Sequence, residues 1–328
     1  MTGYILRRLL VAVLLLVAVV LVTFLVFYGT PRDPAKLLCG KPCTADQLAR
    51  VRDYMQLDHG VLWQFFAFLG GLFAGRTYGT GALQQHCPAP CLGYSFPNGA
   101  PAADLIWDRL PVTLSVAAGA AILALLLGLG LGAVAGWRRD HWPDHLAAAY
   151  STVGLSVPTF LIGLLAVLVF GFQLDMIPYS GYVPLTESPI DWAWHLVGPW
   201  LVLAIPLSAG YVRVTRSQLT AARSAQHLLA MRSRGARPRT VRRHSLRGVM
   251  VPVLTMFGLD AAALLGGTVI TERVFSLHGL GDLLIESVTG SDLGLVVGLT
   301  VVSSAFIIIG NLVLDLALPL MDPRIRRG

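Results

Sequence analysis

The chain has 328 residues, of which 55% are hydrophobic and only 13% are charged, and its formal net charge is +7. A soluble globular domain carries about 25% charged residues, so this composition excludes an ordinary soluble fold and indicates a membrane protein. We attribute the positive charge to loop topology and contact with anionic lipid headgroups, and we expect no nucleic-acid partner.

Six segments are long and apolar enough to cross a bilayer. About 20 mostly apolar residues are needed, because about 30 Å of hydrocarbon is crossed at about 1.5 Å per residue. Five charge-free runs, and one run interrupted only by Asp260, meet this requirement: 9–30, 110–137, 145–174, 192–212, 248–271 and 293–314. A backbone in lipid must satisfy its own hydrogen bonds, so we predict an all-α polytopic membrane protein with six transmembrane helices.

The first segment, within residues 1–30, is predicted to be a retained transmembrane helix. Arg7 and Arg8 precede an apolar run that is longer than the core of a secretory signal, and no small-residue cleavage site follows it. With both termini in the cytoplasm, 17 of the 25 basic residues lie on the cytoplasmic side, including those of a tail at 321–328. Basic residues accumulate in cytoplasmic loops, so we predict an N-in, C-in topology.

Residues 31–108 form the only sizeable non-membrane region, and the predicted topology places them outside the cell. An amphipathic helix is predicted from Thr44 to Met55. All four cysteines of the chain fall here: Cys39, Cys43, Cys87 and Cys91. Their confinement to an exported segment predicts disulfides, with three connectivities left open. A metal or iron–sulfur site built from the two C-x3-C pairs is the alternative, and we expect no metal there because structural zinc pairs usually have tighter spacing.

The loop from Arg213 to Arg247 carries ten arginines and no acid. Helix-forming content at 221–234 is followed by Gly235, a plausible helix stop, and by a second basic segment at 240–247. Two short helices around this glycine would form a cytoplasmic knob, which could enter a groove on a partner and transmit motion to the bundle. Alternatively, these arginines only set the topology and contact lipid phosphates.

Several short motifs occur in the same order as in a known family. The most specific lies in the basic loop, where Arg232-Ser233-Arg234-Gly235 is followed by RHSLR at 243–247 and by Pro252. Further blocks are RR at 7–8, PRDP at 31–34, GYS at 93–95, RLPVTL at 109–114, SVPTF at 156–160, PYSGY at 178–182, GGT at 266–268 with Glu272, VF at 274–275 and GLG at 279–281, and MDPRIR at 321–326. Together they resemble the membrane subunits of ABC-type oligopeptide and dipeptide importers, of the DppB/OppB-like permease type, over nearly the whole chain.

The resemblance implies a type I ABC importer permease fold, with a core at 109–320 and a coupling loop at about 217–247. It also implies a bacterial plasma membrane location, a second related permease subunit as heterodimer partner, two cytoplasmic ATPase subunits and an extracytoplasmic peptide-binding protein. The chain lacks the phosphate-binding G-x-x-x-x-G-K-[ST] motif, so ATP and Mg would be bound by the partner subunits and no cofactor by this chain. The residues expected to contact the ATPase are Ala230, Met231, Arg232, Arg234 and Gly235.

The sequence departs from the family pattern in two places. The coupling motif of many ABC importers reads E-A-A-x-x-x-G, whereas Leu229 and Met231 replace its acid and its second small residue here. Residues 77–92, which contain Cys87 and Cys91, read as an insertion, and we expect this external elaboration to contact the substrate-binding protein.

Three residues are candidates for the translocation pathway: Asp260, Pro158 and Glu272. An acid within a membrane helix is a functional hypothesis by default, because exposing it to lipid costs about 2.5 to 3.5 kcal/mol on insertion scales. For Asp260, a structural hydrogen bond or ion pair to a neighbouring helix is the alternative. Pro158 is expected to kink its helix where a gate could bend, as are Pro206 and Pro252.

An ion-coupled secondary transporter is the main alternative function, since a six-helix bundle with a buried acid could bind an ion. The internal repeats typical of many such transporters are not evident in the sequence. A membrane enzyme is disfavoured, because neither a G-x-S-x-G nor an H-E-x-x-H motif is present. The cargo stays open within the family, which includes permeases for nickel chelates, glutathione and sugars.

Overall fold

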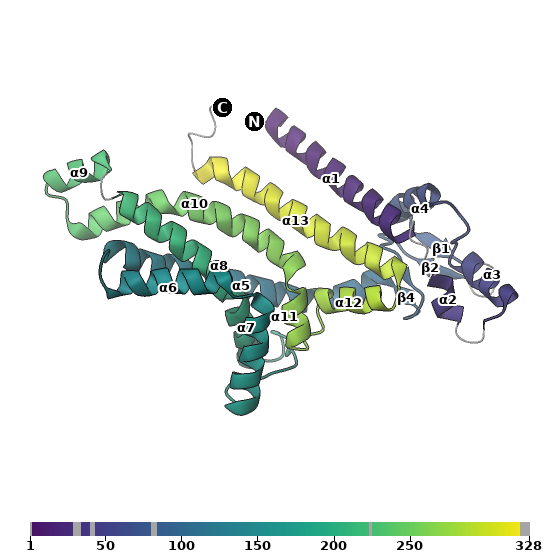
Figure 1. Cartoon of the computed structure of the whole chain (residues 1–328). Coiled ribbons are helices and arrows are strands. Elements are labelled where there is room, and N and C mark those ends of the chain that lie inside the picture. Colours follow the sequence, from purple (N-terminus) through teal and green to yellow (C-terminus); the bar gives the residue numbers. More distant parts are fainter. Residues whose placement is uncertain (1, 29–33, 40–42, 80–83, 223–224, 322–328) are drawn as a thin grey trace. The chain divides into compact units, whose positions relative to one another are not determined.

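The computed structural model describes residues 2–28, 34–39, 43–79, 84–222 and 225–321 (Figure 1). The chain divides into two compact units. Unit 1 comprises Met1–Pro111 and His278–Ile308, and unit 2 comprises Val112–Leu277 and Ile309–Gly328. The predicted cytoplasmic tail at 321–328 lies, after its first residue, outside the described residues.

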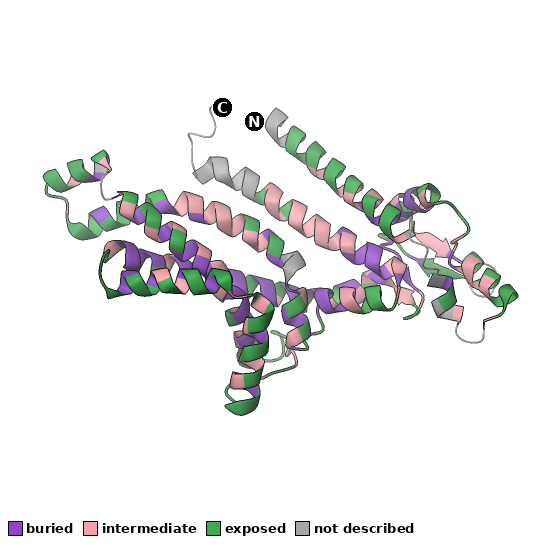
Figure 2. Cartoon of the chain, in the orientation of Figure 1, coloured by how far each residue is buried: buried purple, intermediate pink, exposed green. Residues whose placement is uncertain are grey.

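The prediction of an all-α polytopic membrane protein is confirmed. Among the described residues, five helices are long and apolar enough to span a bilayer: α1 (Thr2–Tyr28), α5 (Ala102–Trp137), α8 (Pro189–Ala222), α10 (Pro238–Gly267) and α13 (Leu293–Met321). Each contains at least 27 residues, more than the roughly 20 that a bilayer requires. Figure 2 shows α1 exposed along much of its length, as expected for a helix whose apolar surface is meant for lipid or a partner.

The predicted helix at 145–174 is not continuous, because the structure breaks it into a bent pair, which gives a sixth candidate span if the pair is counted as one. Helix α6 (Trp142–Ser156) ends before Pro158, and α7 (Thr159–Ala166) continues into the π-helix η2 (Val167–Gln173), at 100° to α6. A proline disfavours helical backbone in the residue before it, and Val157 is accordingly extended, with φ −89° and ψ 126°. Pro206 and Pro252, by contrast, lie inside the continuous helices α8 and α10.

Unit 1 contains α1, a small domain between α1 and α5, α12 (Leu280–Thr289) and parts of α5 and α13. We call this small domain the external domain after its predicted location. The external domain consists of α2 (Pro34–Cys39), α3 (Ala45–Tyr54), α4 (Val61–Ala74) and two antiparallel strand pairs. Strand β1 (Arg76–Tyr78) pairs with β2 (Gln85–Cys87), and β3 (Tyr94–Ser95) pairs with β4 (Ala100–Pro101). A hydrophobic core that includes Phe24, Phe65, Ile106 and Leu299 joins α1, α4, α5 and α13 within this unit.

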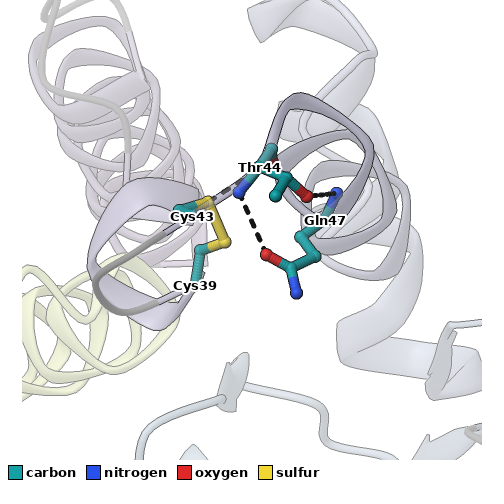
Figure 3. The surroundings of a disulfide bond; sticks show 4 residues. All are labelled: Cys39, Cys43, Thr44 and Gln47. Carbon is teal, nitrogen blue, oxygen red and sulfur yellow. Dashed lines mark hydrogen bonds between the residues drawn. A yellow bond between two sulfur atoms is a disulfide. The ribbon is translucent and has the colours of Figure 1, made fainter.

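The predicted helix at 44–55 is confirmed as α3 and begins with a capping box (Figure 3). The Thr44 hydroxyl accepts a hydrogen bond from the Gln47 backbone N–H at 3.3 Å, and the Gln47 side chain accepts one from the Thr44 N–H at 3.0 Å. This reciprocal pair satisfies donors that every helix leaves free at its start. The N-cap Thr44 thus directly follows Cys43, which is disulfide-bonded to Cys39.

Both disulfides join neighbours within one C-x3-C pair: Cys39 with Cys43, and Cys87 with Cys91. The structure therefore selects one of the three connectivities that the sequence left open. Cysteines paired in this way have no thiolate with which to bind a metal. The second disulfide is buried with Tyr78 and Tyr94, so it forms part of the core of the external domain.

Unit 2 contains α6, α7, η2, α8, α9 (Gln226–Ser233), α10 and α11 (Val269–Val274), with the remainder of α5 and α13. Glycines of α5 let α8 approach closely. A Cβ atom on Gly128 would lie 2.3 Å from the Tyr211 Cβ, and one on Gly132 would lie 2.6 Å from the Thr215 Cβ. Contacts this short do not occur between real carbon atoms, so this α5–α8 packing requires glycine at both positions.

Candidate functional site

The basic loop contains one short helix, α9, whose outer surface is polar and accessible. Leu228 is buried and anchors the helix, while Ala230, Arg232 and Arg234 are exposed and Met231 is half-buried. Leu229 is also exposed, so an apolar side chain accompanies the arginines on this surface. Helix α9 therefore presents cationic and apolar groups together, the combination expected of a protein-docking surface.

Gly235 ends α9 in a Schellman turn. Its φ is +75°, and its N–H donates to the Arg232 carbonyl at 3.0 Å, while the Ala236 N–H donates to the Met231 carbonyl at 3.0 Å. This pair of hydrogen bonds defines the motif, and the left-handed residue at its centre is normally glycine because a Cβ atom is strained there. The predicted helix stop at Gly235 is confirmed.

The prediction of two short helices around this glycine is only half correct. The first, expected at 221–234, is shorter, because α8 extends to Ala222 and α9 begins at Gln226. The second, expected at 240–247, is not a separate element but the first turns of α10, which begins at Pro238 and runs for 30 residues. Proline at the first helical position is favoured, because the missing N–H has no helical partner there. The basic surface is thus continuous with a membrane-spanning helix.

Seven arginines between α9 and the start of α10 are solvent-exposed: Arg232, Arg234, Arg237, Arg239, Arg242, Arg243 and Arg247. None of them forms an ion pair with a described acidic residue. Arg232 and Arg242 border a cleft of about 390 Å³ beside Trp137, and the Arg242 guanidinium lies 5.6 Å from the centre of the Trp137 ring. The site therefore carries concentrated positive charge available to an acidic partner.

Arg216 behaves differently, although it belongs to the same arginine-rich stretch. Its Nε and Nη2 donate to the two carboxylate oxygens of Asp144, the second contact at 3.1 Å. Asp144 is buried and also accepts the Asp140 backbone N–H at 3.1 Å. This bidentate pair joins α6 to α8. The pair was not predicted from the sequence, because Asp144 and Arg216 are 72 residues apart. The position of Asp144 directly before the apolar run at 145–174 could have marked it as an acid that needs a partner.

The three pathway candidates lie on separate elements of the fold. Asp260, on α10, accepts a hydrogen bond from the Tyr211 hydroxyl of α8 at 2.8 Å. This is the interhelical hydrogen bond that the alternative interpretation expected, and it does not test a role in the pathway. Pro158 separates α6 from α7 and is exposed.

Glu272, on α11, is fully buried. Its Oε1 accepts hydrogen bonds from the Thr113 and Thr268 hydroxyls, both at 2.7 Å. Thr113 belongs to the RLPVTL block and Thr268 to the GGT block, so the fold brings three separate sequence motifs into contact. This arrangement ties α5 to the start of α11.

Two further motifs meet in unit 1. Ser95 of the GYS block donates a hydrogen bond to Asp292, and burial raises the pKa of the Asp292 carboxyl above its usual range even though this bond and the Leu295 N–H oppose the shift. Gly93 has φ +115°, and a Cβ atom there would lie 2.5 Å from the Gly294 carbonyl oxygen. Asp292 was not singled out from the sequence, since nothing local marks its partner.

Known proteins of one family match this chain over nearly its whole length. Residues 1–117 match the family described as "Binding-prot-dependent transport system membrane comp, N-term", and residues 128–327 match "Binding-protein-dependent transport system inner membrane component". The chain is 30% identical to "Probable peptide ABC transporter permease protein y4tP" of Sinorhizobium fredii, over 98% of this chain and 99% of the relative. It is 31% identical to the oligopeptide transport system permease protein AppB of Bacillus subtilis and to the glutathione transport system permease protein GsiC of Escherichia coli, over 99% of each chain in both cases.

Proposed function

This chain belongs to the family of binding-protein-dependent transport system inner membrane components, and from that premise we propose that it forms half of the translocation pathway of an ATP-driven peptide importer. It is a multi-pass permease of the ABC class, and such permeases are not themselves enzymes. In our proposal it pairs with a second related permease, two cytoplasmic ATPase subunits that bind ATP and Mg, and an extracytoplasmic binding protein. The assembly would lie in the bacterial plasma membrane.

The observation that carries the proposal is the direct connection between α9 and α10. The Schellman turn at Gly235 holds the short exposed helix against the basic start of α10, a 30-residue helix that is long and apolar enough to span a bilayer. Because only this turn separates the two helices, a partner that displaces α9 would also displace α10. The exposed arginines supply charge complementary to acids on an ATPase, and we assign Arg232 and Arg234 to these contacts.

Peptide cargo is supported by the relatives, whose names specify peptides, oligopeptides and the tripeptide glutathione. Selectivity is expected to reside mostly in the binding protein, which we place against the external domain of this chain. Residues 77–92 would contribute to that contact through Gln85 and His86, which are exposed on β2, while the buried Cys87–Cys91 disulfide would hold this segment in the core of the domain.

The coupling site is tested by replacing two glycines with arginine, one in the turn after α9 and one inside α10. Gly235→Arg and Gly248→Arg add the same side chain, and an added Cβ meets no atom within 4 Å at either position. Only Gly235 requires a positive φ and lies in the proposed contact. Each variant is co-expressed with the candidate ATPases and purified, and both ATPase recovery and ATP hydrolysis are measured.

We expect Gly235→Arg to lose the ATPases or the stimulated hydrolysis, while Gly248→Arg retains both. Equal recovery and equal hydrolysis in the two variants would contradict the coupling assignment. If no ATPase co-purifies even with the unmodified chain, the importer proposal itself fails, and an ion-coupled transport assay becomes the appropriate next measurement.

A further inference from the structure

Helix α4 of the external domain has no charged residue in its 14 positions. Its one strongly polar side chain, Gln64, is turned inward, where it donates to the Gln56 carbonyl and accepts from the Arg76 guanidinium at 2.9 Å. The remaining surface is apolar on all sides. A helix that is hydrophobic all round belongs in a protein core or in a membrane.

The inner face of α4 packs against the external end of α1. Phe24 of α1 contacts Phe65 and Phe68 of α4, with ring centroids 6.1 and 5.4 Å apart, and all three side chains are buried. Phe24 lies three residues before the end of the apolar span Leu6–Phe27, which corresponds to about 4.5 Å along a helix. The contact therefore lies at the depth where α1 leaves the hydrocarbon layer.

The outer face of α4 is uncovered. Leu62, Phe66 and Phe73 project from it within an arc of about 40°, given the 3.6-residue helical period, and Phe73 is 86% exposed. Val22 and Leu25, on the same end of α1 as Phe24, are exposed as well. Figure 2 shows the exposed surface of both helices.

We propose that α4 lies in the outer membrane interface, with Leu62, Phe66 and Phe73 among the lipid acyl chains of the external leaflet. At about 21 Å long, α4 is too short to cross about 30 Å of hydrocarbon, so it lies in the interface and does not span it. Trp63 stacks on His59 with a centroid separation of 4.0 Å and lies 5.4 Å from the Arg76 guanidinium. A tryptophan with polar neighbours is typical of the headgroup level.

This placement gives the external domain a second attachment to the bilayer besides α1. The helix begins after α3 and ends directly before β1, so it lies between the two disulfide-bonded halves of the domain. A lipid-embedded α4 would hold both halves at the membrane surface. The inference requires only that α1 crosses the membrane, and it is independent of the cargo and of the energy source.

Site-directed spin labelling tests the proposal. The native cysteines are paired in disulfides, so a nitroxide reacts with a newly introduced cysteine alone. Phe66→Cys and Phe73→Cys report on the outer face, and Asp46→Cys, on the exposed surface of α3, is the water-facing control. The labelled chain is reconstituted with its co-purifying subunits in phospholipid vesicles, and accessibility to oxygen and to a water-soluble nickel complex is measured by power saturation.

We expect oxygen accessibility to exceed nickel accessibility several-fold at positions 66 and 73, and the order to reverse at position 46. Higher nickel accessibility at 66 and 73 would place the face in water and overturn the proposal. Low accessibility to both reagents would show that a protein surface covers α4, which overturns it equally. Because both phenylalanines are exposed, their substitution is not expected to unfold the domain, and an unchanged elution profile in detergent checks this.

Discussion

The pair formed by Arg216 and Asp144 gives a quantitative test of how unit 2 is held together. The Asp144 side chain is 3% exposed and that of Arg216 is 39% exposed. Removing one partner of a buried ion pair costs about 3 to 5 kcal/mol, chiefly because the other charge stays buried without compensation. Among the described residues, Arg216→Met would leave Asp144 with the Asp140 N–H, at 3.1 Å, as its one remaining hydrogen-bond donor. Since Arg216 is partly solvated, we expect the lower end of that range, about 3 kcal/mol.

The double variant Arg216→Met with Asp144→Leu separates this explanation from a simple loss of contact. If the cost arises from the uncompensated carboxylate, removing it should restore much of the stability, since apolar replacements of buried pairs are often neutral or stabilising. The Asp140 N–H that loses its acceptor lies next to an exposed side chain and can bond water. We therefore expect the double variant to be at least about 2 kcal/mol more stable than Arg216→Met alone.

The assay is equilibrium unfolding of the purified chain in mixed micelles by titration with sodium dodecyl sulfate, followed by circular dichroism. The unmodified chain, both single variants and the double variant complete a thermodynamic cycle. A loss below about 1 kcal/mol for Arg216→Met would mean that the pair behaves like an exposed one. A double variant no more stable than that single variant would refute the uncompensated-charge explanation.

Three further predictions concern local features. Gly235→Ala should weaken the Schellman turn by about 1 to 2 kcal/mol, because alanine is strained at a positive φ. The rate of amide hydrogen exchange at residues 235 and 236 should then rise about 5- to 30-fold. The control Gly248→Ala, at an open position inside a helix, should slow this exchange or leave it unchanged. Gly93→Ala should sharply reduce the yield of folded protein in detergent, because its Cβ would lie 2.5 Å from a backbone carbonyl oxygen; normal yield would show that this backbone adjusts. Burial raises the pKa of Asp292 in the folded state, so its contribution to stability is full below its unfolded pKa of about 3.9 and is lost as pH rises through the folded pKa. As pH rises through that range, the thermal unfolding temperature of Asp292→Asn in detergent should therefore fall less than that of the unmodified chain. Parallel decreases in the two unfolding temperatures would contradict the assignment.

Much of the architecture follows from local sequence pattern. Uninterrupted apolar runs of sufficient length leave the backbone no alternative to helix in lipid, and so five of the six spans were predictable one at a time. The capping residues Thr44 and Gln47 and the turn residue Gly235 act through hydrogen bonds to their own chain neighbours. Features of this kind need no knowledge of the rest of the molecule, and both helix boundaries were predicted correctly.

Other features were decided only by tertiary structure, because they depend on residues distant in sequence. The 100° bend at Pro158 could not be distinguished from the continuous helices through Pro206 and Pro252, since the packing around each proline determines whether a helix continues. Arg216 resembles its neighbouring arginines in sequence, and only the fold places a buried carboxylate opposite it. Likewise, hydropathy marks α4 as apolar, but its inner and outer faces are defined only by the packing of Phe24 against one of them. Local hydrogen bonds and hydropathy thus determined the elements of this protein, whereas the partners of its buried charges and the free surfaces of its helices were determined by long-range packing.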